Sequence, residues 1–329
     1  MRFFCTAPRN TGDLLAAEIL EFGGTDIHEQ TNGVRFSGSL ETGYRLCLWS
    51  RIASKVLLEI KKFDMPAAED LYTTVRSMDW KSHFDVDKTF VINATVTKAS
   101  PANQKFAVLQ TKDGIADFFR DTGGTRPSVD SKFADITIAV HVRDRDATIY
   151  LDLSGHSLHR RGYRRSAGPA PLKENVAAAL LLRSGWPAIA AEGGSLVDPM
   201  CGSGTIPLEA ALIAGGIAPG LSRKTFGFES WNKHQPELWQ KIVAEAKLKR
   251  KAGIEKIPRI TGYDQDRHSI TAAVMSSEIL DLAGIVHFEK RELSDAMPPG
   301  NKAGKGEFAG LVAINPPYGV RLGTKEELL

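Results

Sequence analysis

Residues 196–205 of this chain read LVDPMCGSGT, and this stretch carries the clearest structural signal in the sequence. An apolar run ends in an acid, and a Gly-x-Gly turn then leads into a second apolar run with helical spacing. The order predicts a buried strand over 195–199, a tight turn, and a helix over 206–214. Because glycine has no side chain, such a turn lets the backbone approach a ligand, and the first N–H groups of the helix point toward it. A plain tight turn is the alternative interpretation of the same residues.

The acid at the end of the predicted strand restricts the charge of the ligand that the turn can bind. A turn that binds pyrophosphate normally has a third glycine three residues further on, where this chain has Pro207. A carboxylate at Asp198 would also repel a phosphate, whereas it suits a cationic group such as the amino group of a methionyl moiety. Cys201 lies where a small side chain is needed, so we assign it no nucleophilic role. The predicted ligand-binding residues around the turn are Asp198, Pro199, Cys201, Gly202, Gly204 and Thr205.

Strands and helices alternate through the rest of this half of the chain. Further strands are predicted over 259–263, 285–289 and 311–314, with a helix over 267–284 between the first two. A long, charged helical insertion covers 235–253. The alternation is typical of an α/β fold with a doubly wound, Rossmann-like parallel sheet, in which ligands bind at the carboxyl ends of the strands.

Two more acids follow the second and third of these strands. Asp264 lies at the tip of the second strand, where a carboxylate can accept hydrogen bonds from both hydroxyls of a ribose, while Asp266 can instead cap the next helix. The separation of Asp198 and Asp264 far exceeds the spacing of about 20 residues found in dinucleotide-binding folds, so a nicotinamide oxidoreductase is a distant alternative. Glu292, after the third strand, is a candidate for contacting an adenine amino group, although an ordinary surface glutamate fits the pattern nearly as well.

The fourth strand runs into an unusual sequence, Asn315-Pro316-Pro317-Tyr318. The two prolines stiffen the backbone, so the Asn315 amide and the Pro316 carbonyl are held in one direction. Their oxygens can accept both hydrogens of a planar NH₂ group, and Tyr318 offers a face on which a base can stack. Asn315, Pro316, Pro317 and Tyr318 are therefore the predicted catalytic residues.

In this order the motifs resemble those of class I S-adenosylmethionine-dependent methyltransferases, in the branch that methylates amino groups conjugated to a ring or a carbonyl. The resemblance covers about 171–319 and implies S-adenosylmethionine as the cofactor, with Asn315 also close to it. It extends to the entry of a predicted helix over 172–182, where Lys173 is expected beside the cofactor. Transfer would depend on positioning and charge alignment, without a covalent enzyme intermediate. The Asn-Pro-Pro-Tyr turn alone leaves adenine N6, guanine N2 and a glutamine amide open as acceptors.

The first half of the chain mixes helices and strands and has no internal repeat. Strands are predicted over 3–7, 34–38, 56–60 and 89–97, helices around 14–20, 44–49, 71–78 and 106–120, and a hairpin over 136–142 and 147–153. Within this half, 112–117, 126–130 and 151–164 look like parts of a THUMP domain, an RNA-binding α/β module joined to RNA-modifying enzymes. A ferredoxin-like subdomain usually precedes that domain.

The two resemblances together are closest to the bacterial methyltransferases that make N2-methylguanosine in 23S ribosomal RNA, and the insertion at 226–231 also suits that family. They predict a ferredoxin-like subdomain over 1–43, a THUMP domain over 44–154, a basic linker over 155–170 and a methyltransferase domain over 171–329. The expected partner is large-subunit ribosomal RNA, naked or in early assembly, whose target base must leave its duplex before methylation.

Other functions fit parts of the same pattern. A THUMP-bearing transfer-RNA guanine-N2 methyltransferase shares both halves of the expected architecture, and a non-catalytic RNA-binding module would use only the first half. The acids Asp198 and Asp264 together with Asn315 argue against a vestigial catalytic half. DNA adenine methylation is disfavoured, because no DNA-reading domain is evident.

The predicted linker carries a basic run, HSLHRRGYRR over 156–165, which holds four arginines and a tyrosine and no acid. A solvated linker is one interpretation, and a segment that contacts phosphates and stacks on a base is the other. The predicted RNA-binding residues are Arg126, Arg160, Arg161, Tyr163, Arg164 and Arg165. His156 and His159 are expected to face RNA or solvent, and the sequence suggests no set of metal ligands.

The composition is that of a folded protein with more than one core: 42% of the 329 residues are hydrophobic and 25% are charged, and the net charge is +3. No run of about eighteen apolar residues is present, so no membrane partner is expected. The N-terminus lacks the apolar region of a secretory signal and the three cysteines are widely spaced, so we expect a cytoplasmic protein.

Ten residues follow Gly319, and 324–327 has a capping-box pattern. We therefore expect an incomplete methyltransferase sheet of four strands, in a chain that binds RNA but methylates poorly or not at all.

Overall fold

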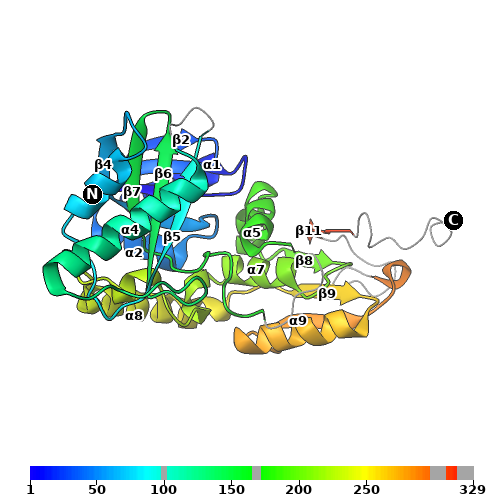
Figure 1. Cartoon of the computed structure of the whole chain (residues 1–329). Helices are drawn as coiled ribbons and strands as arrows, with labels where there is room; N and C mark the ends of the chain where they lie inside the picture. The colour runs from blue at the N-terminus through cyan, green and yellow to red at the C-terminus, as the bar shows by residue number, and fades with distance from the viewer. Residues whose placement is uncertain (98–101, 165–171, 297–308, 317–329) are drawn as a thin grey trace. The chain divides into compact units, whose positions relative to one another are not determined.

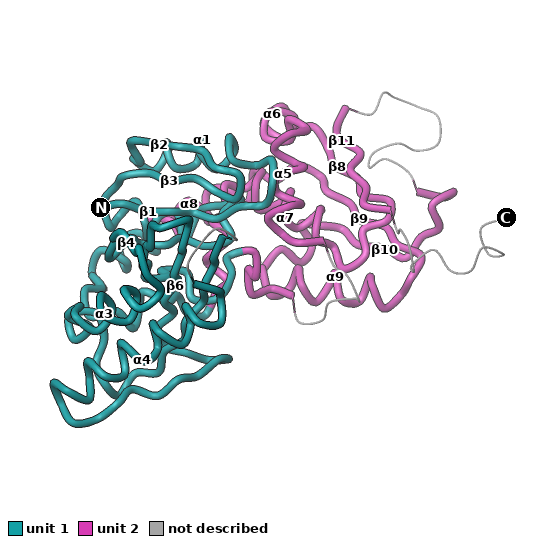
Figure 2. Tube along the Cα trace, turned by 45° about the horizontal axis from the view of Figure 1, so that its top comes forward, with its two compact units in different colours: residues 1–158, 224–244 teal, residues 159–223, 245–329 magenta. Residues whose placement is uncertain are grey.

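The computed structural model describes residues 1–97, 102–164, 172–296 and 309–316, and Figure 1 shows its elements, many of them labelled. The chain forms two compact units (Figure 2). Unit 1 comprises Met1–Leu158 and Lys224–Ala244, and unit 2 comprises His159–Arg223 and Glu245–Leu329. Each unit has its own β-sheet, and helix α8 (Pro236–Ile254) runs from one unit into the other.

Unit 1 is built on a seven-stranded mixed sheet with the order β2-β3-β1-β4-β7-β6-β5. Neighbouring strands are antiparallel, except that β5 and β6 are parallel. The strands are β1 (Arg2–Thr6), β2 (Thr25–Gln30), β3 (Gly33–Ser37), β4 (Lys55–Asp64), β5 (Phe90–Val96), β6 (Ile136–Arg143) and β7 (Asp146–Asp152). Because β4 pairs with β1 on one side and β7 on the other, the N-terminal strands and the later hairpin form one continuous sheet.

The described helices of unit 1 are α1 (Gly12–Glu21), α2 (Leu40–Trp49), α3 (Asp70–Ser77) and α4 (Gln104–Gly123), with 3-10 turns η1 (Trp80–Ser82) and η3 (Gly227–Ser230). α2 begins where the Ser39 side chain accepts a hydrogen bond from the Thr42 N–H, and Asn103 caps α4 in the same way. The strands, helices and hairpin predicted for this half are confirmed. The sequence pattern does not predict β2, because its residues are polar and mostly exposed and show no alternation.

The insertion at 226–231 belongs to unit 1, although the predicted division places it in the methyltransferase domain. The ring of Phe228 lies 4.4 Å from that of Tyr44 and 4.9 Å from that of Trp239, measured between centroids. Burial of these aromatic rings against α2 explains why residues 224–244 fold with the first part of the chain. The predicted boundary after residue 43 likewise falls inside α2.

Unit 2 contains a four-stranded sheet with the order β10-β9-β8-β11, in which every strand pair is parallel. The strands are β8 (Ser195–Asp198), β9 (Ile260–Asp264), β10 (Val286–Lys290) and β11 (Gly310–Val312). The helices described in this unit are α5 (Glu174–Arg183), α6 (Trp186–Ala191), α7 (Thr205–Ala214) and α9 (Arg267–Ile279), with 3-10 turns η2 (Pro219–Ser222) and η4 (Leu293–Asp295). α7 packs on β8 and β9, and α9 packs on β9 and β10.

The predicted α/β fold with a parallel sheet is thus confirmed, and each of the four predicted strands is present among the described residues. The core of unit 2 buries Trp186, Leu196, Ile206 and Ile260 between the sheet and its helices. Within the described residues, no helix combines the length and the apolar character needed to cross a bilayer.

Candidate functional site

The turn after β8 has the geometry that its glycines predict. Gly202 and Gly204 both adopt left-handed backbone conformations, with φ of +54° and +81°. A Cβ at Gly202 would meet no atom within 4 Å, whereas a Cβ at Gly204 would lie 2.8 Å from the Phe288 ring. Gly202 therefore borders open space in which a ligand can lie, while Gly204 is required by packing at the start of α7.

Two acids flank this turn. Asp198 is buried, and its Oδ1 accepts a hydrogen bond from the Met200 N–H at 3.1 Å. Burial, together with the nearby charge of Asp264, raises the pKa of Asp198 to about 7. Asp264 accepts hydrogen bonds from the Gly202 N–H at 2.8 Å through Oδ2 and from the Asp266 N–H at 2.9 Å through Oδ1. The two carboxyl groups therefore approach the same turn from neighbouring strand tips.

Asp266 has the capping role that the sequence offered as its alternative. Its carboxylate accepts hydrogen bonds from the backbone N–H groups of His268 and Ser269 at the start of α9. That assignment leaves Asp264 as the acid at the end of β9, and its contact with a ribose stays a prediction.

The Asn-Pro-Pro-Tyr segment begins at the same edge of the sheet. β11 pairs in parallel with β8, and the Ala313 N–H donates to the Val197 carbonyl at 3.0 Å. Asn315, which follows two residues later and is partly buried, therefore lies at the sheet edge where Asp198 ends β8. Pro316 is exposed, and Pro317 and Tyr318 lie outside the described residues.

The remaining predicted cofactor residues lie around this edge. Glu292 is exposed in the segment after β10, and the preceding Arg291 N–H bonds to the Asp264 carbonyl at 3.0 Å. Lys173 is exposed at the start of α5. The sequence pattern does not predict that the Arg291 guanidinium covers the Tyr263 ring, 4.6 Å from its centroid. An arginine within a charged segment carries no periodic signal that would reveal such a contact.

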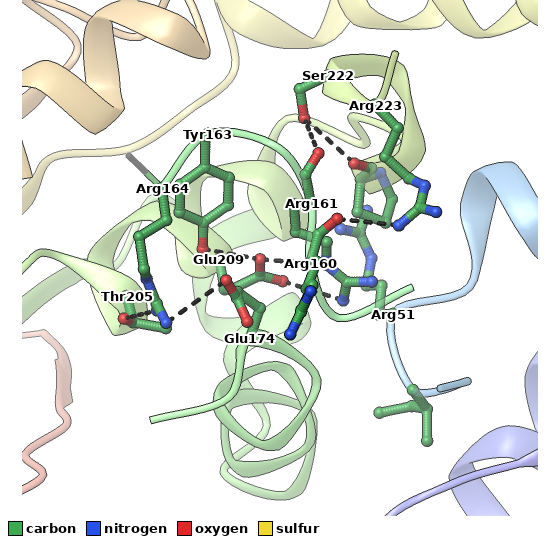
Figure 3. Close-up of polar contacts among 12 residues, drawn as sticks. Arg51, Arg160, Arg161, Tyr163, Arg164, Glu174, Thr205, Glu209, Ser222 and Arg223 are labelled. Atoms are coloured by element: carbon green, nitrogen blue, oxygen red, sulfur yellow. Dashed lines mark hydrogen bonds and ion pairs between the residues drawn. The ribbon is translucent and has the colours of Figure 1, made fainter. Parts of the chain in front are cut away.

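Three members of the basic run point into the protein, so part of the RNA-binding prediction is wrong. Arg161 and Tyr163 are each 1% exposed, and both face Glu209 in the middle of α7 (Figure 3). Arg161 Nε lies 3.4 Å from Glu209 Oε1, and the Tyr163 hydroxyl donates to the same oxygen at 3.2 Å. Side chains buried against an internal carboxylate cannot contact a phosphate. A sequence signal existed, because Glu209 is a lone acid in an apolar helix and needs a buried partner.

Arg164 is also directed inward, which corrects its assignment to RNA. Its side chain is 12% exposed. Nη2 donates to the Leu172 carbonyl at 3.1 Å and to Thr205 Oγ1 at 2.6 Å, and Nη1 lies 3.6 Å from Glu174 Oε1. Arg164 therefore contacts the first residue of α7 and the entry to α5.

For the other three residues, RNA binding stays a prediction. Arg160 is exposed, and its backbone carbonyl accepts from Arg223 Nη1 at 2.9 Å. Arg126 is exposed in unit 1 and forms an ion pair with Asp117 at 3.0 Å. Arg165 lies outside the described residues.

Exposed lysines and arginines of unit 2 are also frequent on the second half of α8 and in the segment after it. We call this set the α8 basic surface, and its exposed members are Lys247, Lys249, Lys251, Lys256 and Arg259. The sequence identifies this region only as a charged insertion, because periodicity alone does not tell which face of a long polar helix is left in solvent.

Comparison with known proteins agrees with this architecture. A family model described as "RMKL-like, methyltransferase domain" matches residues 161–329, which is just over half of the chain. The chain belongs to this family. Two further models match the parts that precede the family domain: a THUMP domain over 67–152 and an RlmL ferredoxin-like domain over 2–57.

The chain is also similar to longer proteins and to solved structures. "Ribosomal RNA large subunit methyltransferase K/L" of Allochromatium vinosum is 47% identical over 326 residues, which are 99% of this chain and 44% of the relative. The chain thus spans less than half the length of that relative. A structure from Listeria monocytogenes, described as a predicted N6-adenine-specific DNA methylase, has a TM-score of 0.83 at 27% sequence identity. The match covers 99% of this chain and 82% of the Listeria chain. The structure of SMU.472, a putative methyltransferase complexed with SAH, has a TM-score of 0.82 at 27% sequence identity. The match covers 99% of this chain and 83% of the SMU.472 chain.

Proposed function

We propose that this chain binds S-adenosylmethionine at the turn after β8 and serves in methylating the exocyclic N2 amino group of a guanine in 23S ribosomal RNA. The observation that carries the proposal is the meeting of Asp198, Asp264 and Asn315 at the carboxyl edge of one parallel sheet. Family membership supports it, as do the name of the Allochromatium vinosum relative and the SAH complex of a structural neighbour.

The chain's residues fit the proposed cofactor. Asp198 is a buried carboxyl at a strand tip, suited to a cationic amino group, and Gly202 leaves open space beside it. Asp264 would accept hydrogen bonds from the ribose hydroxyls, and Glu292 would meet the adenine amino group. The further residues proposed to border the cofactor are Lys173, Pro199, Cys201, Gly204, Thr205 and Asn315. When bound, the cofactor supplies an electrophilic methyl group on a sulfonium.

The protein's part in the reaction is then to position the acceptor. The Asn315 side-chain oxygen and the Pro316 carbonyl would accept the two N–H groups of the target amine and direct its lone pair toward the methyl group. The same oxygens would stabilise the positive charge that grows on nitrogen. The alkylated nitrogen is acidic and would lose its proton to water, so no strong general base is required. Pro317 would stiffen the segment, and Tyr318 would stack on a base that has left its duplex.

RNA would be held mainly through contacts to its phosphates. The proposed substrate is large-subunit ribosomal RNA, naked or in early assembly, in keeping with the THUMP match and with the name of the relative. Arg126, Arg160 and Arg165 remain proposed contacts, and the α8 basic surface adds exposed lysines that can neutralise phosphates. Such contacts would set affinity rather than sequence preference.

Mass mapping of methylated nucleotides tests the proposal. Ribosomal and transfer RNA would be compared from a wild-type strain, a strain lacking the gene, and a strain carrying Asn315→Ala in the full-length gene. We expect one N2-methylguanosine of large-subunit RNA to be lost in both altered strains, while the Asn315→Ala protein still binds S-adenosylhomocysteine. Retained methylation with Asn315→Ala would overturn the assigned mechanism. Loss confined to transfer RNA would instead favour the transfer-RNA guanine-N2 activity.

A further inference from the structure

The segment 161–164 forms a buried polar cluster with α5 and α7 inside unit 2 (Figure 3). Two arginines, Arg161 and Arg164, are set against two glutamates, Glu174 and Glu209, each of which is less than a tenth exposed. Burial raises the pKa of Glu174, and the guanidinium of Arg164 beside it acts in the opposite direction. Charges this deeply buried persist only when paired, so the cluster is an internal part of the unit.

The two arginines of the cluster act on different parts of α7. Arg161 contacts Glu209 in the middle of the helix, and its backbone carbonyl accepts a hydrogen bond from Ser222 Oγ at 2.8 Å. Arg164 contacts Thr205, the first residue of α7, which directly follows the Gly202–Gly204 turn. Arg161 is therefore an anchor for the helix, whereas Arg164 is linked to the end that faces the proposed cofactor.

Arg164 also contacts the segment that enters α5. It donates to the Leu172 carbonyl at 3.1 Å and lies 3.6 Å from Glu174, so its contacts are with the two residues that flank Lys173 in the sequence. One guanidinium thus joins two segments that are separated by more than 30 residues in the sequence and that both carry predicted cofactor residues. A lysine cannot make this set of contacts, because its single ammonium lacks the planar fork of arginine.

We propose that Arg164 is a positioning residue for the cofactor site, fixing the Thr205 hydroxyl and the glycine turn relative to the entry of α5. The inference rests on the proposed function, since it assigns a role in binding the same cofactor. The Thr205 oxygen accepts a hydrogen bond from Arg164 at 2.6 Å, which leaves the hydroxyl proton to be donated to a ligand such as the carboxylate of a methionyl group. Arg164, a member of the basic run in the predicted linker, would thus help to hold the cofactor site in place.

Calorimetric titration of the purified chain with S-adenosylhomocysteine tests this role. We expect Arg164→Lys to bind about tenfold more weakly than the wild type, since one charge-assisted hydrogen bond is lost. Thr205→Val should cause a similar loss, and Thr205→Ser, which keeps the hydroxyl, should restore most of the affinity. The double variant Arg164→Lys/Thr205→Val should bind no more weakly than either single variant, because both remove the same contact.

A matched control separates positioning from stability. Arg250 donates to the Leu280 carbonyl at 2.6 Å and to Asp281 at 2.9 Å, a comparable set of partners within unit 2. Arg250→Met should lower the melting temperature and leave the affinity for S-adenosylhomocysteine unchanged. Equal weakening by Arg250→Met and Arg164→Lys would overturn the inference, as would additive losses in the double variant.

The result for the wild type distinguishes this inference from the proposed function. If the wild-type chain binds S-adenosylhomocysteine and Arg164→Lys binds it equally well, the positioning role is refuted and the proposed function stands. If the wild-type chain binds neither S-adenosylhomocysteine nor S-adenosylmethionine, the proposed cofactor site fails and the positioning role fails with it.

Discussion

Replacement of Asp198 by asparagine should stabilise the ligand-free chain at alkaline pH and weaken cofactor binding. Burial and the charge of Asp264 raise the pKa of Asp198 from 3.8 to about 7. Since one pKa unit corresponds to about 1.4 kcal/mol, the ionised carboxylate costs the folded state on the order of 4 kcal/mol relative to the unfolded chain. Asparagine carries no charge, yet its side-chain oxygen can still accept the Met200 N–H. We therefore expect Asp198→Asn to raise the free energy of unfolding by about 2–4 kcal/mol near pH 8.

The pH dependence of stability has a definite sign. Because the pKa of Asp198 is higher in the folded than in the unfolded chain, its contribution to stability is greatest below pH 3.8 and is lost as pH rises toward about 7. For this one group the loss between about pH 5 and pH 8 amounts to roughly 2.5 kcal/mol, and the variant should lack it.

Cofactor binding should have the opposite pH dependence. Only the ionised Asp198 carboxylate can pair with a cationic amino group, so wild-type affinity should fall about tenfold for each pH unit below 7. Asp198→Asn should bind weakly at every pH, since it removes the charge altogether.

Urea denaturation and calorimetric titration with S-adenosylhomocysteine, each over about pH 5 to 8, measure both effects. Asp266→Asn is the control, because hydrogen bonds from Ser269 and His268 lower the pKa of Asp266 and it stays ionised throughout this range. The control should show the wild-type pH dependence of stability. The reasoning is refuted if Asp198→Asn also shows that dependence, or if it binds S-adenosylhomocysteine as tightly as the wild type.

Three further perturbations address separate parts of the molecule. Gly202→Ala should lower the free energy of unfolding by only about 1–2 kcal/mol, yet it should block the binding of S-adenosylhomocysteine. Gly204→Ala should lower the free energy of unfolding more, because its Cβ would lie 2.8 Å from the Phe288 ring. Equal losses of stability for the two variants in urea denaturation would contradict this contrast. Glu209→Gln should remove the carboxylate that faces the buried Arg161 guanidinium and lower the free energy of unfolding by about 3 kcal/mol, with part of it recovered on adding Arg161→Met. A neutral single variant would disprove a stabilising role for this ion pair. The double variant Lys247→Glu/Lys251→Glu should bind a large-subunit RNA fragment more weakly in filter-binding assays, without a change in its affinity for S-adenosylhomocysteine. The slope of the logarithm of RNA affinity against the logarithm of salt concentration should decrease in magnitude by about 1.5. A slope equal to that of the wild type would exclude this surface from RNA contact.

Much of the architecture follows from local sequence patterns. The run that ends at Asp198, the glycine turn and the apolar helix after it predict β8 and α7 closely, because strand and helix periodicities are set by nearby residues. The meeting of Asp198, Asp264 and Asn315 at one edge is also predictable, since all parallel strands end at the same side of a sheet.

Other features depend on partners that are distant in the sequence. Strand β2 has a polar sequence and forms only because β3 is beside it. Residues 224–244 join unit 1 because the aromatic rings of Phe228 and Trp239 pack with Tyr44, nearly 200 residues earlier in the chain. No local pattern could assign that segment to one unit or the other.

The basic run marks the limit of sequence reasoning most clearly. The sequence by itself determined the fold class, the glycine turn and the strand-tip residues, because these follow from periodicity and from the rule that parallel strands share an edge. Whether Arg161 and Arg164 meet RNA or the protein interior was decided only in the tertiary structure, by carboxylates and hydroxyls elsewhere in the chain: Glu209 is 48 residues from Arg161. The physical reason is that a buried charge is stable only beside its partner, and the partner is brought there by the fold rather than by its position in the sequence.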